Sequence, residues 1–280
     1  MSLRKLPEIR AFAPSGVHFD MRPDAIERWT PEIRAAQEDE ATISILDPIG
    51  MTWEGEGVTA KRIGAALRAI GKRDVVVNVN SPGGDFFEGV AIYNMLREHP
   101  GKVTVRVMGL AASAASVIAM AGDDLLMGDG AFLMIHNAWA VAVGNRHDMR
   151  TAADQLEPFD QAMAGVYSAR TGIKADRVAE LMDAETWINS AQAVDEGWAS
   201  GLIERESVLI DETKAQGNRK ALALVEAAMA KAGYTRSTRR DTLHALFSDK
   251  PGAVGKDAKP GAGEDIAASL QSLIHSLKGN

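Results

Sequence analysis

The sequence contains no cysteine, which excludes disulfide bonds, thiolate metal sites and a cysteine nucleophile. It has no long hydrophobic run either, because the most apolar stretch, residues 107–122, is too short and too rich in alanine and serine to span a bilayer. The phosphate-binding pattern of P-loop ATPases is missing as well. We therefore expect no membrane partner and no ATP hydrolysis of the P-loop kind.

The remaining polar residues favour neither a metal nor a nucleic acid. The six histidines are scattered and form no ligand-spaced pair, so we expect no metal and no other cofactor. The formal net charge is −7 and the acidic excess lies in residues 1–210, which argues against nucleic acid as a partner. The tail is mildly basic around Arg236, Arg239 and Arg240, and we interpret it as a solvated segment. The first ten residues lack the apolar region of a secretion signal, so we expect an intracellular protein.

The hydrophobic pattern predicts an α/β domain over residues 41–207 with largely parallel strands, because short apolar strands alternate with helices. We expect strands at 41–46, 74–80, 102–108, 125–127 and 131–135, and helices at 59–70, 88–97, 111–121, 146–169, 175–182 and 190–196. Pro158 should kink or split the longest helix.

Two further segments flank this domain. Residues 1–40 have four prolines and no long periodic stretch, and we expect a partly disordered arm with a short strand at 8–13. Residues 208–280 form a tail with a helix at 218–232, a flexible linker at 249–265 and an amphipathic helix at 266–277.

Ser113 stands in a run of very small residues, 109–116 (GLAASAAS), between a predicted strand and the first turn of a helix. Small neighbours allow a substrate backbone to approach, and a helix N-terminus stabilises negative charge. Free N–H groups at such a turn can hold an oxyanion. Taken alone the pattern is a weak signal, because it is more often that of a tightly packed buried helix without any catalytic role.

Two other segments could complete a site. Residues 80–84 (NSPGG) follow a strand and precede a helix, and the paired glycines allow close approach by another chain or simply form a turn. His136 ends the strand at 131–135, where the chain leaves the core, and could be a general base or a structural histidine. His99 and His147, in polar turns, are poorer candidates.

In combination, residues 80–84, 109–116 and 134–137 (MIHN) resemble the proteolytic subunit of the Clp proteases, the S14 serine peptidases. The resemblance covers residues 42–205. It is nearest to the Clp-like proteases of tailed phages and prophages that mature the capsid, as residues 182–187 (MDAETW), Ala193-Val194 and Gly197 indicate. It implies the Clp protease/crotonase-like fold of repeated β-β-α units with a handle helix, here within residues 144–169.

The resemblance also implies a mechanism. Ser113 matches the nucleophile and His136 the general base, and the N–H groups of Gly84 and Ala114 match the oxyanion hole. Glu185 stands where the family has an aspartate. Two alternatives stay open, namely Asp183 as the third member, or a Ser–His dyad without an acid.

The resemblance further implies a homo-oligomeric ring that cleaves polypeptides. The first hypothesis is a head maturation protease that cuts scaffold or capsid protein in the bacterial host cytoplasm, inside procapsids. The second is a housekeeping peptidase that works with a separate AAA+ unfoldase, which the proline-rich residues 1–40 do not favour. A crotonase-type thioester enzyme and a non-catalytic ring are weaker alternatives, because Ser113 and His136 are both present.

Overall fold

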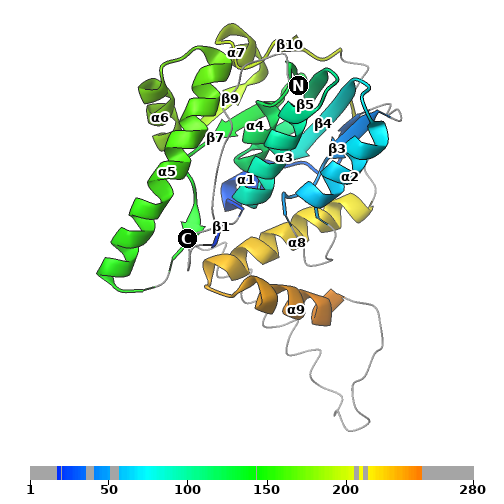
Figure 1. Ribbon diagram of the computed structural model, residues 1–280. Coiled ribbons are helices and arrows are strands. Elements are labelled where there is room, and N and C mark those ends of the chain that lie inside the picture. Colours follow the sequence, from blue (N-terminus) through cyan, green and yellow to red (C-terminus); the bar gives the residue numbers. More distant parts are fainter. Residues whose placement is uncertain are drawn as a thin grey trace. The chain divides into compact units, whose positions relative to one another are not determined.

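The computed structural model describes residues 18–19, 21–35, 41–50, 57–142, 144–204, 208–210 and 214–247 (Figure 1). All of them except the last three belong to one compact unit, Met1–His244. The strand expected at residues 8–13, the linker at 249–265 and the helix at 266–277 lie outside the described residues.

A seven-stranded sheet forms the centre of this unit. Its strands run in the order β10-β6-β5-β4-β3, and β7 pairs with both β5 and β9. Every pair is parallel except β7 with β9. The strands are β3 Thr42–Ile45, β4 Val75–Ser81, β5 Val103–Ala112, β6 Asp124–Met127, β7 Phe132–Ile135, β9 Thr186–Asn189 and β10 Gly201–Leu202.

The helices expected within 41–207 are all present, and the α/β class is confirmed. They are α2 Ala60–Ile70, α3 Phe86–Glu98, α4 Ala114–Ala119, α5 Arg146–Thr171, α6 Ala175–Asp183 and α7 Ser190–Asp195. None of the helices in the described ranges is long and apolar enough to cross a membrane.

Helix α5 is continuous through Pro158, so of the predicted kink or split the split does not occur. Its ends are well defined: Asn145 and Asp148 form a reciprocal capping box, and Gly172 closes the helix in the left-handed conformation. A proline removes one N–H donor from a helix. The other turns of this 26-residue helix and its buried face, which includes Phe159 and Met163, hold it together.

Strand β5 is longer than predicted. It continues to Ala112, and the helix that we expected from residue 111 begins only at Ala114. Alternate residues of β5 face opposite sides of the sheet, as the period of a strand requires. Ala111 belongs to the main core with α3 and α4, whereas Leu110 and Ala112 belong to a second cluster on the other face.

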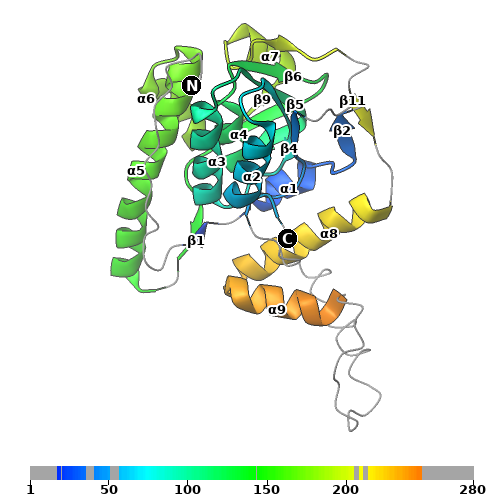
Figure 2. The same cartoon turned by 45° about the vertical axis from the view of Figure 1, so that its right-hand side comes forward.

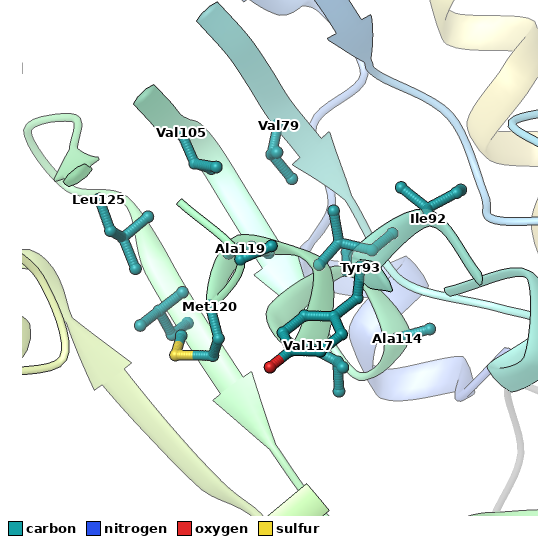
Figure 3. Close-up of a cluster of buried hydrophobic side chains, with 14 of the residues drawn as sticks. Val79, Ile92, Tyr93, Val105, Ala114, Val117, Ala119, Met120 and Leu125 are labelled. Atoms are coloured by element: carbon teal, nitrogen blue, oxygen red, sulfur yellow. The ribbon is translucent and has the colours of Figure 1, made fainter. Parts of the chain in front are cut away.

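The main core lies between the sheet and helices α3 and α4 (Figure 3). Val79 of β4 and Val105 of β5 point toward Ile92 and Tyr93 of α3, and Val117 of α4 lies among them. The two helices approach closely, because a Cβ on Gly89 would lie 2.9 Å from the Cβ of Ala114. The very small residues after β5 therefore serve packing as well as access.

The second cluster joins the N-terminal segment to the sheet. This segment forms α1 Pro23–Arg28 and β2 Ile33–Ala35, neither of which the sequence analysis anticipated. The side chain of Trp29 is fully buried, and its indole Nε1 donates to the carbonyl oxygen of Asn80 over 2.9 Å. The amide Nδ2 of Asn80 donates in return to Thr30 O at 2.7 Å. These contacts make part of the predicted arm an integral layer of the fold.

The chain after residue 207 closes this layer. Strand β11 Val208–Ile210 pairs with β2, and α8 Lys214–Lys231 packs against α1 through Ala223 and Ala227 (Figure 2). The helix predicted at 218–232 is thus present and starts earlier, and α9 Arg236–Phe247 follows it. A separate two-stranded sheet pairs β1 His18–Phe19 with β8 Ala140–Val141 in antiparallel fashion.

Candidate active site

Ser113 stands alone between strand β5 and helix α4 in a backbone conformation that side chains rarely adopt, with φ 55° and ψ −126°. Such a conformation costs about 1–3 kcal/mol and persists only where the surroundings hold it. Here the N–H of Ser113 donates to Met134 O of β7 at 2.9 Å, and its carbonyl accepts from Ser116 Oγ at 2.6 Å. The residue as a whole is only partly buried. This is the strained strand-to-helix turn of a nucleophile elbow.

The loop after β4 lies directly against this turn. A Cβ on Gly83 would come within 2.6 Å of Ala112 O, and a Cβ on Gly84 within 2.2 Å of Ile49 O. Both glycines have positive φ, 88° and 143°. Only glycine therefore permits the chain to approach Ser113 in this way.

Two backbone N–H groups beside Ser113 suit an oxyanion. On either side of Gly84 the donors are engaged, since Gly83 N bonds to Ser81 Oγ at 3.2 Å and Asp85 N to Ile49 O at 2.9 Å. Ala114 opens helix α4, where the first N–H groups have no partner within the helix. The helix N-terminus and the glycine loop thus meet at Ser113.

His136 follows strand β7, next to the strand end that receives the Ser113 N–H. Its side chain is 5% exposed, and among the described residues its Nε2 has no hydrogen-bond partner. Burial and, after it, the charge of Arg22 lower the pKa of His136 to about 4, although Glu185, Asp24 and a backbone hydrogen bond with Asn137 oppose the shift. The imidazole is therefore neutral at pH 7, the form that accepts a proton.

Both candidate acids lie near His136, in different settings. Asp183 ends α6 and accepts a hydrogen bond from Asn137 Nδ2 at 2.6 Å. Glu185 has φ 52° and precedes β9, which pairs with the strand before His136. The segment is not extended, so the two acids do not share a face in the way that a strand would impose. Glu185, and not Asp183, contributes to the pKa of His136.

Arg22, which the sequence analysis did not single out, binds Glu185 with both arms of its guanidinium. One Nη pairs with Oε1, and the other lies 2.6 Å from Oε2. The Nε of Arg22 donates to Asp24 Oδ1 at 2.9 Å. No local pattern could have revealed this ion pair, because its partners are 163 positions apart.

Two residues of α5 also reach this region. Tyr167 is fully buried, and its hydroxyl lies 2.8 Å from Ser116 Oγ, which links the helix to the carbonyl of Ser113. Asp160 accepts from the N–H of Ala138 at 2.5 Å, two residues after His136. Desolvation raises the pKa of Asp160 to about 6. A polar residue on the buried face of a long helix is the only signal that could have identified either one.

Metal chemistry has no evident ligand set in the described ranges, where no group of three His, Asp or Glu side chains is placed to hold an ion. A serine on a strained turn, beside a glycine loop and a neutral buried histidine, is an arrangement suited to acyl transfer by a serine hydrolase.

The chain belongs to the Clp protease family, which it matches over residues 39–206, more than half of its length. Membership agrees with the α/β fold and makes the chain a serine-type endopeptidase, as the sequence predicted. Residues 21–35 and the tail from 208 onward lie outside the matched range.

Individual relatives agree with this assignment. The chain is 30% identical over 146 residues to the ATP-dependent Clp protease proteolytic subunit 3 of Rhodococcus jostii (strain RHA1), covering 51% of this chain and 72% of that protein. It is 25% identical over 217 residues to the proteolytic subunit 1 of Streptomyces avermitilis, covering 75% and 98%. Among solved structures, a ClpP1 variant from Listeria monocytogenes is similar, with a TM-score of 0.49 and 21% identity over 59% of this chain and 92% of that one.

Proposed function

We propose that Ser113 is the nucleophile of this peptidase, His136 its general base and Glu185 the acid that orients the imidazole. The observation that carries the proposal is the strained turn at Ser113, because nothing in ordinary packing requires φ 55° at a serine. The N–H groups of Gly84 and Ala114 form the oxyanion hole. The approach of the loop at Gly83 to Ser113 supports this assignment.

The proposed reaction has two stages. Ser113 Oγ attacks the scissile carbonyl and its proton passes to His136 Nε2, while the two N–H groups hold the developing oxyanion. The imidazolium then gives the proton to the leaving amine as the C–N bond breaks. Water, deprotonated by His136, attacks the acyl-serine and releases the second product.

Glu185 is preferred to Asp183 as the third member. Its charge acts on the pKa of His136, whereas Asp183 is engaged with Asn137. The extra methylene of glutamate is no obstacle, since triads with glutamate occur on other folds. The alternatives are Asp183 as the third member and a Ser–His dyad without an acid. Comparing the labelling rates of Glu185→Gln and Asp183→Asn distinguishes them: the variant that slows labelling identifies the acid, and no effect in either variant indicates the dyad.

The test is covalent labelling of the purified full chain with a fluorophosphonate. The Oγ–P bond forms, the P–F bond breaks and fluoride leaves, while the proton goes to His136. We expect an adduct on Ser113 that is absent in Ser113→Ala and at least about 100-fold slower in His136→Ala. His99→Gln removes another buried imidazole, bound to Arg73 O at 2.7 Å, and should leave labelling unchanged. An adduct elsewhere, or none, contradicts the assignment.

For the substrate, we propose scaffold or capsid protein cleaved within procapsids, in the bacterial host cytoplasm. Support comes from residues 182–187, which resemble those of the phage-type proteases, and from the chain on both sides of the matched range. A variant lacking residues 249–280 should remain a peptidase but enter procapsids less. Unchanged packaging contradicts the proposed role of the tail.

The alternative is ATP-dependent proteolysis with a separate AAA+ unfoldase, which the names of the two relatives favour. We expect instead that the chain cleaves its protein substrate without ATP. A homo-oligomeric ring is proposed for either function, with the 26-residue helix α5 as its handle. Light scattering of the purified chain measures this: a monomer at working concentration contradicts the ring.

A further inference from the structure

Arg22 engages both carboxylate oxygens of Glu185, the acid proposed to orient His136. The guanidinium is itself held in place, because its Nε donates to Asp24. The Arg22 side chain is 17% exposed and that of Glu185 is 46% exposed, so the cation is half-shielded while solvent reaches the carboxylate. A bidentate Arg–carboxylate pair of this kind is stronger and more directional than a lysine contact.

The chain around Arg22 is anchored on both sides. Directly before it, strand β1 pairs with β8, which begins four residues after His136. Directly after it, α1 lies between the sheet and α8, with Ile26 and Trp29 fully buried. Lys220 Nζ of α8 donates to the carbonyl of Glu27 at 2.7 Å. The fold therefore fixes the position of Arg22 over Glu185.

We propose that Arg22 is a positioning residue that restrains this active site by holding Glu185 in an ion pair and away from His136. The inference rests on the proposed function of Ser113, His136 and Glu185. Arg22 lies outside residues 39–206, the range that matches the family. When its charge is compensated by Arg22, Glu185 stabilises less well the imidazolium that forms as Ser113 attacks.

The state of His136 agrees with this restraint. Its Nε2 has no partner among the described residues, and the nearby positive charge lowers the pKa of the imidazole beyond the effect of burial. A general base works best when its pKa lies near the working pH. Removal of the Arg22 charge should thus make His136 a stronger base and free Glu185 to accept its N–H.

The test compares the rate of fluorophosphonate labelling of Ser113 in full-length variants. We expect Arg22→Gln to label about tenfold faster than wild type. Arg22→Lys keeps the charge but not the bidentate guanidinium, so its labelling rate should lie between those of wild type and Arg22→Gln. Arg28→Gln is the matched control, since Arg28 is the last residue of the helix that Arg22 precedes and its guanidinium lies 4.1 Å from the centre of the Trp187 ring. It should label at the wild-type rate.

A double-mutant cycle shows whether Arg22 acts through Glu185. In the Glu185→Gln background, Arg22→Gln should give a smaller acceleration, because only the direct effect of the Arg22 charge on His136 is then left. An undiminished gain overturns the proposed route through Glu185. With a peptide substrate, the gain in Arg22→Gln should appear in kcat and leave KM unchanged, which a loosened fold would not produce.

Failure of this inference can be told from failure of the proposed function. If wild type is labelled on Ser113 and both Arg22 variants are equally fast or slower, Arg22 does not restrain the site, while the peptidase assignment stands. If no variant is labelled on Ser113, the proposed function fails and the inference fails with it. Arg22→Lys retains the charge, so it answers the question even where Arg22→Gln does not fold.

Discussion

A Cβ atom on Gly83 would lie 2.7 Å from the Cβ of Ser113. Real Cβ atoms essentially never approach so closely, so an alanine there must push the loop away from the serine. Because Gly84 follows immediately, the displacement carries the proposed oxyanion donor with it. A substitution that widens the spacing between Gly83 and Ser113 therefore tests whether the loop forms part of the site.

We expect Gly83→Ala to slow labelling of Ser113 on the order of 100-fold, as a misplacement of about 1 Å can do. Gly130→Ala is the matched control, because Gly130 also has positive φ, 71°, but no atom within 4 Å of a new Cβ. The control should lose about 1–2 kcal/mol of stability and label normally. Normal labelling in Gly83→Ala would show that the loop does not form part of the site.

The pH profile of labelling should reflect the low pKa of His136. Its pKa is about 4, mainly because it is buried; Arg22 lowers the value as well, and Glu185, Asp24 and a backbone hydrogen bond with Asn137 raise it. The base is neutral above this pH, so the rate should be constant from about pH 5.5 to 8 and fall by half near pH 4. Arg22→Gln removes a positive charge and should shift the midpoint upward.

Glu185→Gln provides the opposite control for this profile. It removes a negative charge that raises the pKa of His136, so the midpoint should move downward. A wild-type midpoint near the ordinary value of about 6.5 would contradict the burial of the imidazole. Labelling should be followed with intact-protein mass spectrometry at each pH, with unfolding checked by tryptophan fluorescence.

The link from Tyr167 to Ser116 should stabilise the turn at Ser113. Tyr167→Phe removes one hydrogen bond and should cost about 1 kcal/mol. Ser116→Ala also removes the bond to Ser113 O and leaves the buried Tyr167 hydroxyl without its partner, so it should cost about 2–3 kcal/mol. Urea unfolding measures both, with the exposed Tyr234→Phe as control. Equal losses in the two variants contradict the proposed order.

Asp160 should give stability that depends on pH. Its folded-state pKa is raised to about 6 from 3.8, so its contribution is fully present below about pH 4 and is lost as pH rises toward 6. Relative to Asp160→Asn, wild type should therefore lose about 1 kcal/mol across this interval, after allowance for partial exposure. Asp154→Asn, exposed on the same helix, should show no such difference. A difference that does not change with pH contradicts the shift.

The local parts of the site could be predicted from the sequence. Ser113, His136 and the glycines of the loop at 83–84 each stand where a predicted strand ends, and the carboxyl ends of parallel strands meet at one edge of a sheet. The resemblance supplied their proposed roles. Even here the strand–helix boundary was misplaced by about three residues, because the high helix propensity of alanine is overridden by the pairing of Ala111 and Ala112 in the sheet.

Residues that act across the fold could not be predicted. Arg22 and Tyr167 have no motif, and each reaches the site from a segment far along the chain. The N-terminal layer was equally hidden. In the sequence Trp29 is a single aromatic residue in a proline-containing segment, which predicts no buried position. Only the folded sheet provides the buried carbonyl of Asn80 that accepts the hydrogen bond of its indole N–H.

The sequence by itself thus determined the fold class, the family and the local segments around Ser113 and His136, because these depend on periodicity and on short runs of residues. Only the tertiary structure brings the charges of Glu185 and Arg22 close enough to act on the pKa of His136. Charges interact through space over a few ångströms, and positions 22, 136 and 185 come within that distance only after the sheet has formed.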